Sequence, residues 1–347
     1  MKETRYSDAG VDISAANEAK KRITAAVKAT HGSQVLGGIG GFGGLFSTEG
    51  FPPDPVLVSS IDGVGTKLKI AFLLDKHDTV GEDIVNHCVN DILVQGAHPL
   101  FFMDYLATGK LDPGTIEKVV EGIARACRVN SCALLGGETA EMPGFYAEGE
   151  YDLAGTIVGV VSRKSILTGE TVKNGDVLLG LASSGLHTNG YSLARKVLLE
   201  MARLPIEKSH PDLGHSLGEE LLQPHRSYSP SMLPLAEKNL IRGMVHITGG
   251  GFDGNIPRVV PDRYKAVVNK GSWEVLPIFD LIARLGNVPE DEMYLTFNMG
   301  IGLIVIVADD NANDVERELR STGETVYRIG HIENRKPDEE PVLFTKV

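Results

Sequence analysis

The sequence has few cysteines, no excess of basic residues and no long apolar run. Its three cysteines, Cys88, Cys127 and Cys132, make neither a disulfide framework nor a Cys-x-x-Cys zinc site. The formal charge of -12 argues against a surface built for nucleic acid or an anionic membrane, because such surfaces need clustered Lys and Arg. No apolar run reaches membrane-spanning length and Met1 to Gly10 lacks a signal core, so we expect a cytoplasmic protein in a reducing compartment.

What is present is ordinary globular composition, 42% hydrophobic and 23% charged over 347 residues, which is enough for two domains with real cores. Strand and helix patterns alternate along both halves, which predicts a mixed α/β (α+β) fold. A polar segment from Ser162 to Asn174 suggests domains at 1–167 and 168–347. The expected strands are Val56–Ile61, Leu100–Ala107, Cys132–Leu135, Tyr151–Val161, Val177–Ala182, Val245–Thr248, Tyr264–Asn269, Ile301–Ala308 and Thr325–Ile332. The expected helices are Ala15–Ala29, Leu68–Leu74, Ile84–Leu93, Pro113–Val129, Tyr191–Met201, Pro277–Leu285 and Asn311–Ser321, while residues 203–228 read as irregular.

The stretch from Cys88 to Pro99 ends an amphipathic helix in a Gly-Ala-x-Pro turn. Apolar residues recur there and in the turns before it every three to four positions, and five polar residues fall off that stripe: Asp83, Asn86, His87, Asn90 and Asp91. Gly96 and Pro99 end the helix, because glycine takes the left-handed cap conformation and proline cannot continue it. The pattern therefore predicts one apolar face and one polar, metal-capable face.

Three carboxylates stand at the ends of expected elements. Asp62 follows a strand and opens Asp62-Gly-Val-Gly-Thr-Lys67, Asp91 lies on the helix, and Glu138 follows Gly136-Gly137 after another strand. Each one alone is equally consistent with a solvated turn acid. Together they are predicted to converge on Mg²⁺, which prefers hard oxygen ligands and bridges nucleotide phosphates.

Two glycine-rich stretches contain a formal Gly-x-Gly-x-x-Gly pattern. The first, Gly37–Gly44, lacks the strand before and the helix after that dinucleotide binding requires, so we interpret it as either a surface loop or a mobile lid over phosphates. The second, Gly249–Gly254, lies between a strand and a helix but lacks the partner acid, so we expect a phosphate or ribose contact. His187 lies in the turn Ser183–Gly190 and is either a backbone-bonding residue or a general base.

These motifs resemble a known family. Asp91-x4-Gly96-Ala97-x-Pro99 is similar to the signature of an ATP-using superfamily that includes thiamine monophosphate kinase, selenophosphate synthetase and formylglycinamidine ribonucleotide synthetase. Within it the chain resembles the phosphoribosylformylglycinamidine cyclo-ligases over nearly its whole length. The motifs that carry this resemblance are Tyr6–Asp12, Gly40–Gly44, Asp62–Lys67, Gly136–Gly144, Ser183–Gly190 and His246–Gly251.

The resemblance implies a two-domain ATP-using synthetase that closes an imidazole ring in purine biosynthesis, with ATP and Mg²⁺, as a homodimer paired through the N-terminal sheets. It implies catalytic roles for Asp62, Lys67, Asp91 and His187, and metal binding by Asp62, Asp91 and Glu138. Nucleotide binding would fall to Gly40, Gly41, Phe42, Gly43, Gly63, Gly65, Thr66, Gly136, Gly137 and Thr139. Substrate binding would fall to Asn189, His246, Thr248, Gly249, Gly250 and Gly251.

Two segments depart from the family pattern. Gly254 stands where an acid is usual before Asn-Ile-Pro, with Asp253 one residue early. His225 and Ser227 stand where Thr and Ile are usual, and that segment receives no role here. Three alternatives stay open: selenophosphate synthetase, thiamine monophosphate kinase and an inactive nucleotide-binding partner. The first of them would require a reactive cysteine near the first glycine loop, and no cysteine precedes Cys88.

Overall fold

The computed structural model describes residues 10–38 and 40–346. This part of the chain divides into two compact units. Unit 1 runs to Val89 and resumes from Pro99 to Val160, and unit 2 takes Asn90–His98 together with the chain from Val161 onward. The change of unit after Val160 lies a few residues before the boundary expected at 167/168. The short segment that unit 2 takes from the middle of unit 1 was not anticipated.

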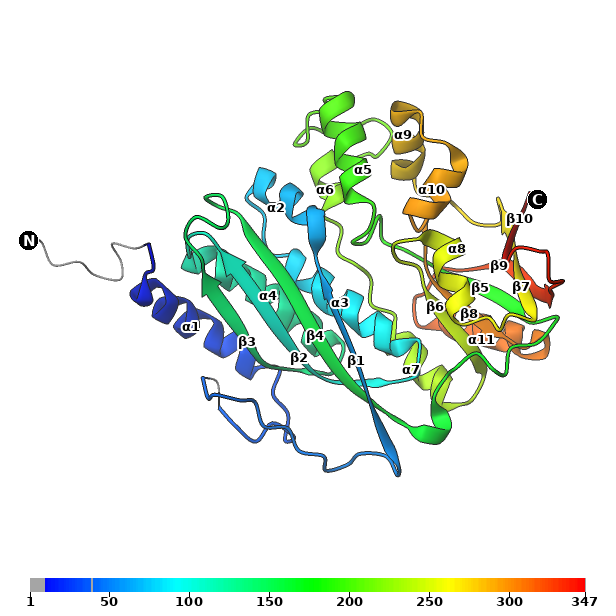
Figure 1. The fold of residues 1–347 in the computed structure, drawn as a ribbon, viewed down its shortest axis with the longest axis horizontal. Coiled ribbons are helices and arrows are strands. Elements are labelled where there is room, and N and C mark those ends of the chain that lie inside the picture. The colour runs from blue at the N-terminus through cyan, green and yellow to red at the C-terminus, as the bar shows by residue number, and fades with distance from the viewer. Residues whose placement is uncertain (1–9, 39, 347) are drawn as a thin grey trace, which may run out of the picture. The chain divides into compact units, whose positions relative to one another are not determined.

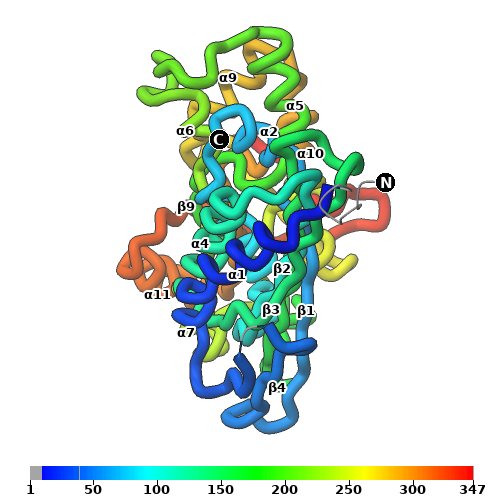
Figure 2. The backbone as a smooth tube through the Cα atoms, turned by 90° about the vertical axis from the view of Figure 1, so that its left-hand side faces the viewer, coloured from blue at the N-terminus to red at the C-terminus, as the bar shows by residue number. Residues whose placement is uncertain are grey.

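Unit 1 is a four-stranded sheet with helices packed on one face (Figure 1). Its strands are β1 (Pro55–Gly63), β2 (His98–Thr108), β3 (Ala133–Glu141) and β4 (Tyr151–Ser162), in the order β1-β4-β2-β3. Its helical elements are α1 (Ile13–Lys28), η2 (Gly65–Lys67), α2 (Leu68–Leu74), most of α3 (Val80–Leu93) and α4 (Pro113–Val129). Figure 2 shows α1 lying beside α4.

Local sequence explains where α4 begins. Asp112 accepts a hydrogen bond from the Thr115 backbone N–H at 2.7 Å, which satisfies one free donor of the first turn. Pro113 occupies the first helical position, where its missing N–H costs nothing. The predicted bounds Pro113–Val129 are confirmed, as are those of Leu68–Leu74.

Unit 2 contains a six-stranded sheet in the order β10-β7-β9-β5-β8-β6. Its strands are β5 (Val177–Ala182), β6 (Ile241–His246), β7 (Tyr264–Lys270), β8 (Ile301–Val307), β9 (Val326–Asn334) and β10 (Val342–Lys346). Its helical elements are η3 (Arg163–Ser165), α5 (Tyr191–Arg195), η4 (Lys196–Met201), α6 (Leu217–Leu221), α7 (Ser229–Glu237), α8 (Gly251–Asn255), η5 (Ile256–Arg258), α9 (Pro277–Gly286), α10 (Glu290–Thr296) and α11 (Asp309–Ser321). Every residue of β8 is buried, in keeping with its unbroken apolar sequence.

Several sequence predictions are wrong in detail. The expected turn at Gly136–Thr139 belongs to β3, which continues to Glu141. The segment 203–228, read as irregular, contains α6, and α7, α10 and β10 were not predicted. The helix expected over Tyr191–Met201 widens after Arg195 into a π-helical turn.

The predicted polar face of α3 is largely buried. Asp83, Asn86, His87 and Asn90 are all buried, and only Asp91 keeps partial exposure in that set. A helix buried on all sides must give each polar side chain a partner, since an unpaired buried polar group is costly. Those partners form the candidate site.

Candidate functional site

Asp62 lies at the end of β1 and holds two different groups. Its Oδ1 accepts a hydrogen bond from the Gly63 N–H at 2.6 Å, and its Oδ2 lies 2.8 Å from Nε2 of His87 on α3. The His87 side chain is buried, whereas that of Asp62 is 43% exposed. Gly65, with φ of 68°, then starts η2, and both it and Thr66 are exposed. The expected order of strand, glycine turn and helix is therefore present, with one carboxylate oriented by a buried imidazole.

Lys67 is not placed as the sequence suggested. Its Nζ lies 2.8 Å from Oδ1 of Asp83, and both side chains are 0% exposed. Burial lowers the pKa of the Lys67 ammonium, and the charge of Asp83 opposes that shift. The positive charge of Lys67, for which the resemblance implies a catalytic role, is thus balanced inside unit 1 by the Asp83 carboxylate.

Glu138 does not share a site with Asp62 within one chain. Strands β1 and β3 are the two edges of the unit 1 sheet, separated by β4 and β2. Three strand spacings of about 4.8 Å separate them by roughly 14 Å, far more than two ligands of one ion tolerate. The predicted convergence of these two acids is wrong for a single chain, because the sequence does not reveal strand order.

The residues around Glu138 alternate between the two faces of β3. Glu138 pairs in register with Tyr105 and Gly137 pairs with Asp104, so Glu138 lies on the open face and Gly137 on the helix-covered face. A Cβ at Gly137 would lie 2.3 Å from the Asp104 carboxylate, which explains a glycine within a strand. Burial raises the pKa of Asp104 to about 7, and the nearby charge of Glu138 adds to this. Gly136 and Thr139 lie on the same strand, not in a phosphate turn.

The first glycine loop projects from unit 1. Gly40, Gly41, Phe42 and Gly43 are exposed, and Gly40 has φ of 91°. The base of the loop is fastened by the Leu36 N–H to Leu45 carbonyl bond at 2.9 Å, and by Phe46, whose ring lies 5.2 Å from that of Phe101. A fixed base with an exposed glycine-rich tip is compatible with either of the roles considered for it.

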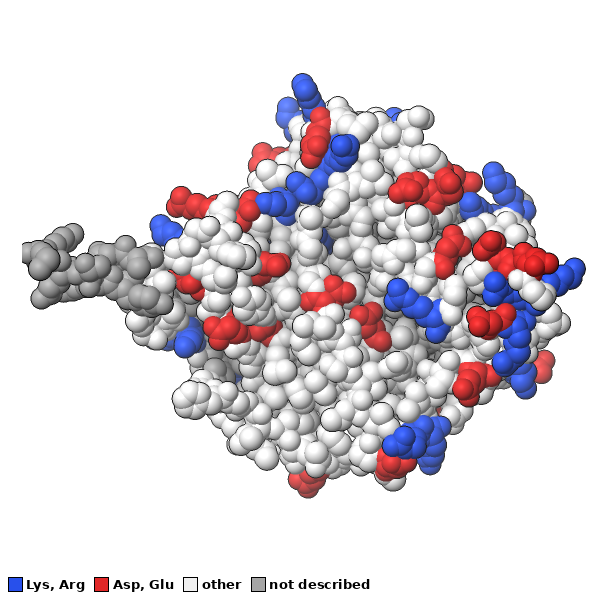
Figure 3. Space-filling view, in the orientation of Figure 1, with Lys and Arg blue, Asp and Glu red and all other residues white. Residues whose placement is uncertain are grey.

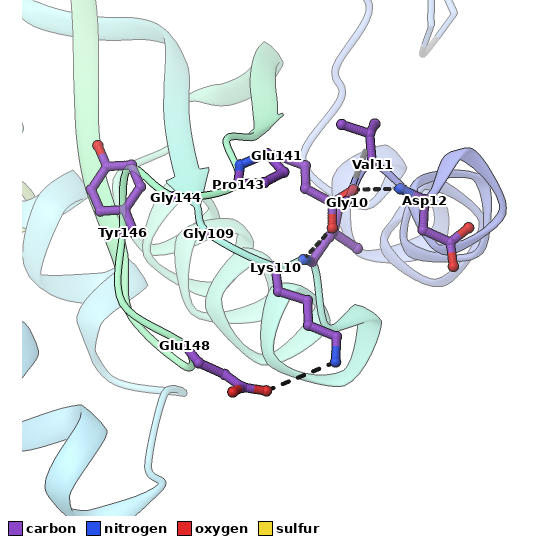
Figure 4. Close-up of a pocket in the computed structure, with 11 residues that line it drawn as sticks. Gly10, Val11, Asp12, Gly109, Lys110, Glu141, Pro143, Gly144, Tyr146 and Glu148 are labelled. Atoms are coloured by element: carbon purple, nitrogen blue, oxygen red, sulfur yellow. Dashed lines mark hydrogen bonds and ion pairs between the residues drawn. The ribbon is translucent and has the colours of Figure 1, made fainter. Parts of the chain in front are cut away.

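Unit 1 also has a cavity of about 490 Å³ that none of the predicted site residues lines (Figure 4). Glu141 joins two of its walls, since its carboxylate accepts the Asp12 N–H at 2.6 Å and the Leu111 N–H at 2.7 Å. Lys110 faces Glu148 across 3.8 Å on another side. Asp12 also caps α1 through the Ser14 and Ala15 N–H groups, so Glu141 and Asp12 together fix the start of this helix. Of the motif Tyr6–Asp12, residues 6–9 lie outside the described residues.

In unit 2 the main pair is Asp91 with His246. Asp91 Oδ1 lies 2.9 Å from Nδ1 of His246 at the end of β6. The His246 side chain is buried and that of Asp91 is 28% exposed. Gly96, with φ of 77°, ends the segment after α3, and a Cβ there would lie 3.3 Å from the Ser165 carbonyl oxygen. The Gly96–Pro99 turn thus packs closely against Ser165, near the beginning of the second segment of unit 2.

His187 is 1% exposed, and of the two roles considered for it the structure supports the backbone-bonding one. Its Nε2 accepts a hydrogen bond from the Ser184 N–H at 3.2 Å, and its ring stacks on that of His225 with centroids 4.0 Å apart. Its φ of 60° is unusual for a residue with a side chain. His187 therefore supports the turn Ser183–Gly190 from within.

The two predicted substrate segments of unit 2 do meet. A Cβ at Gly249 would lie 3.4 Å from Oδ1 of Asn189, so the glycine turn passes beside the Ser183–Gly190 turn. The Asn255 amide holds the glycine turn by donating to the carbonyl oxygens of Thr248, Gly249 and Gly251, the last at 2.7 Å. Gly250 has φ of 91°, and Gly251 packs against the Tyr294 carbonyl too closely for any side chain. The Asn189 Nδ2 atom is buried and has no hydrogen-bond acceptor among the described residues.

Sequence reasoning missed four residues that the structure places around the predicted ones: His87, Asp83, Glu141 and His225. His87 and Asp83 were noted only as polar positions on a helix. The available signal was that two such residues lie on the polar face of a helix, but their partners lie on other segments and cannot be read from the sequence. Nothing local identifies His225, because its partners come from three distant segments.

The fold and these pairs define a two-domain mixed α/β protein that presents aspartates at the ends of its elements. Family models agree: the AIR synthase related protein N-terminal domain matches residues 47–161 and its C-terminal domain matches residues 173–340. Two similar curated proteins are the phosphoribosylformylglycinamidine cyclo-ligases of Bacillus cereus (strain G9842), over 326 residues, and Bacillus mycoides (strain KBAB4), over 327 residues. Each is 54% identical, covering 94% of either chain. The chain belongs to the family of phosphoribosylformylglycinamidine cyclo-ligases.

Solved structures show the same fold at low identity. A thiamine-monophosphate kinase from Stenotrophomonas maltophilia K279a matches with a TM-score of 0.69 at 19% identity, covering 94% of this chain and 95% of that one. A hydrogenase maturation protein HypE in complex with ATP matches with a TM-score of 0.65 at 16% identity, covering 94% and 89%. Within the described residues, no helix is both long and apolar enough to cross a membrane.

Proposed function

We propose that this chain converts formylglycinamidine ribonucleotide into aminoimidazole ribonucleotide with consumption of ATP. The γ-phosphoryl group is transferred to the formamide oxygen, because an amide oxygen leaves poorly until it is phosphorylated. The amidine nitrogen then attacks that carbon, the ring closes and phosphate departs with the former formamide oxygen. The observation that carries the assignment is that the family signature is present with its aspartate, Asp91, held by a buried histidine and still open to solvent.

Each unit offers a carboxylate whose chemistry fits magnesium. Asp62 and Asp91 each present carboxylate oxygens on a partly exposed side chain, and each is oriented by one imidazole, His87 or His246. Carboxylate oxygens are the protein ligands that Mg²⁺ favours, and hydrogen-bonded second partners orient them. When bound, the ion would neutralise phosphate charge. Glu138 is not included in this set, since it lies at the opposite edge of the sheet from Asp62.

Backbone groups are proposed to hold the phosphates. Gly65 and Thr66 are exposed in the turn that leads from β1 into η2, and backbone N–H groups at such a helix start favour an anion. Gly63 precedes this turn, and its N–H is bonded to Asp62. The Gly40–Gly43 loop is proposed to cover the nucleotide, which would protect an activated intermediate from water. Lys67 is proposed to hold α3 against this turn through Asp83 and not to touch phosphate directly.

Unit 2 is proposed to bind the ribonucleotide. Asn189 offers an amide N–H without an acceptor among the described residues, beside the amides of Gly249, Gly250 and Gly251. Such a group gains a hydrogen bond when an oxygen-rich ligand arrives. Thr248 and His246 lie on the same segment, and His246 is already directed toward Asp91.

We also propose a homodimer that pairs through the open face of the unit 1 sheet. Leu57 and Ile61 on β1 are 63% and 71% exposed, and Met103 and Tyr105 on β2 are 40% and 42% exposed. Figure 3 shows few charged side chains over the lower part of this sheet. Apolar residues in such a row are typical of a protein interface. Ile61→Lys should shift the mass measured by light scattering from dimer to monomer; an unchanged dimer would contradict this interface.

We propose a cytoplasmic location because the three cysteines are buried and none is in a disulfide, as expected in a reducing compartment.

The activity is tested by turnover. Purified chain with ATP, Mg²⁺ and formylglycinamidine ribonucleotide should release ADP and form aminoimidazole ribonucleotide in equal amounts. Thiamine monophosphate, offered in place of the ribonucleotide, should give no ADP. Absence of the aminoimidazole product from folded protein would overturn the proposal, and ADP formed with thiamine monophosphate would favour the kinase.

A further inference from the structure

His225 lies at the centre of a hydrogen-bonded network in unit 2, although no role was assigned to it. Its Nε2 faces Nε2 of His246 at 3.0 Å, and its Nδ1 faces Thr188 Oγ1 at 3.2 Å. The His225 side chain is fully buried, and its ring stacks on His187 with an interplanar angle of 24°. Rotation of the ring would therefore break contacts at both nitrogen atoms and along its face.

The segment that carries His225 is clamped from two sides. The Asn90 side chain accepts the Tyr228 N–H at 3.1 Å and donates to the Arg226 carbonyl at 2.8 Å, which also fixes the orientation of its amide. Asn90 Nδ2 lies 3.2 Å from Nε2 of His225. On the other side, Ser184 Oγ donates to the Pro224 carbonyl at 2.6 Å. The ring is thus held by the end of α3 and by the Ser183–Gly190 turn at once.

A continuous chain of contacts results. It runs from Asp91 through His246 and His225 to Thr188, with separations of 2.9, 3.0 and 3.2 Å. Asp91 belongs to the proposed metal-binding set, and Thr188 precedes Asn189 in the proposed substrate turn. His225 joins these two sides.

We propose that His225 is a positioning residue for the cyclo-ligase reaction: it fixes the rotation of the His246 ring, and through it the Asp91 carboxylate, relative to the Thr188–Asn189 turn. A metal-bound ligand and a ribonucleotide must be aligned closely for transfer, and misplacement by about 1 Å lowers rates by about 100-fold. This inference rests on the proposed function of Asp91. It predicts that loss of the His225 nitrogen atoms weakens catalysis without removing any group that touches substrate.

The test is a double-mutant cycle on kcat. His225→Leu keeps similar volume but removes both nitrogen atoms, and it should lower kcat at least about tenfold, with KM for the ribonucleotide changed less than threefold. The Mg²⁺ concentration for half-maximal rate should rise as well. In a His246→Leu background the same His225→Leu change should cost less than twofold, because the ring it positions is gone. Equal losses in the two backgrounds would overturn the proposal.

Two further variants separate positioning from folding. His225→Gln keeps a hydrogen-bonding group near the former Nε2 and should retain kcat within about threefold; a loss as large as that of His225→Leu would also overturn the proposal. His77 in unit 1 is a matched control, since it is buried and bonded at both nitrogen atoms, to Tyr151 and Asp75. His77→Leu should lower stability without changing the Mg²⁺ dependence. If His225→Leu does not fold, the cycle is run with His225→Asn.

The two proposals fail in distinguishable ways. If wild-type protein forms no product, the proposed function fails. The network is then still tested by ¹⁵N coupling across the His225–His246 hydrogen bond in histidine-labelled protein, where absence of coupling contradicts the contact itself. Suppose that the wild type is active and Asp91→Asn is inactive. A His225→Leu variant with wild-type kcat then refutes the positioning role and leaves the proposed function standing.

Discussion

Units 1 and 2 each contain an aspartate that contacts a buried histidine, but the neighbours of the two pairs differ. In unit 1, the Asp62–His87 pair accompanies a separate ion pair, Lys67–Asp83, which is wholly buried. In unit 2, the Asp91–His246 pair continues into a network through His225 to Thr188. Removal of a partner should therefore act mainly on stability in the first case and mainly on turnover in the second.

The largest effect is expected for Lys67→Met. It leaves the Asp83 carboxylate buried without its cation, and breaking a buried ion pair in this way costs about 3–5 kcal/mol. Urea unfolding of wild type and variant measures this free energy. Adding Asp83→Leu should recover part of the loss. Wild-type stability combined with a raised KM for ATP would instead return Lys67 to phosphate binding.

Asp91→Asn should lose most activity, at least about 100-fold, which corresponds to about 2.7 kcal/mol at the transition state. The amide keeps the size of the side chain but lacks the charge that a metal ion requires. Steady-state kinetics with light scattering should show an inactive protein of unchanged mass. The matched control is Glu138→Gln, expected to stay within threefold of wild type because Glu138 and Asp62 lie at opposite sheet edges. Wild-type turnover by Asp91→Asn would refute its metal role.

His187→Ala should destabilise unit 2 by about 1–3 kcal/mol, because it removes the stack on His225 and the acceptor for the Ser184 N–H. Thermal unfolding measures the loss. KM for the ribonucleotide should change less than threefold, since the ring is buried. His187→Asn distinguishes the effect of backbone strain from the effect of losing the ring, because Asn tolerates the left-handed conformation that His187 adopts. A tenfold rise in KM would show that His187 contacts substrate after all.

The last prediction concerns pH and unit 1. The pKa of Asp104 is raised to about 7 from 3.8, so the native state binds its proton more tightly than the unfolded chain. The stability from this group is complete below pH 3.8 and is lost as the pH rises through about 7. Asp104→Asn should therefore gain stability over wild type at pH 8 but much less at pH 5, measured by urea unfolding. An equal difference at both values would contradict the raised pKa.

Local sequence predicted those elements whose signals are self-contained. For α4, the cap at Asp112, Pro113 and the apolar spacing all lie within the segment, so its bounds are confirmed. For β3, the two adjacent glycines led to the prediction of a turn. Gly137 is required instead because a side chain there would collide with the Asp104 carboxylate on the neighbouring strand. A prediction made along the chain has no access to a clash across a sheet.

The family, the mixed α/β class and most helices and strands could be predicted from the sequence, because motif order and apolar periodicity are properties of the chain. The sequence also singled out Asp62 and Asp91. Which acids lie close together, and which histidine rings contact them, became known from the folded structure. Strand order placed Glu138 at the opposite edge from Asp62, and the approach of three distant segments made His225 a central contact. Hydrogen bonds act over about 3 Å, so a residue's partner is known only once the chain has folded.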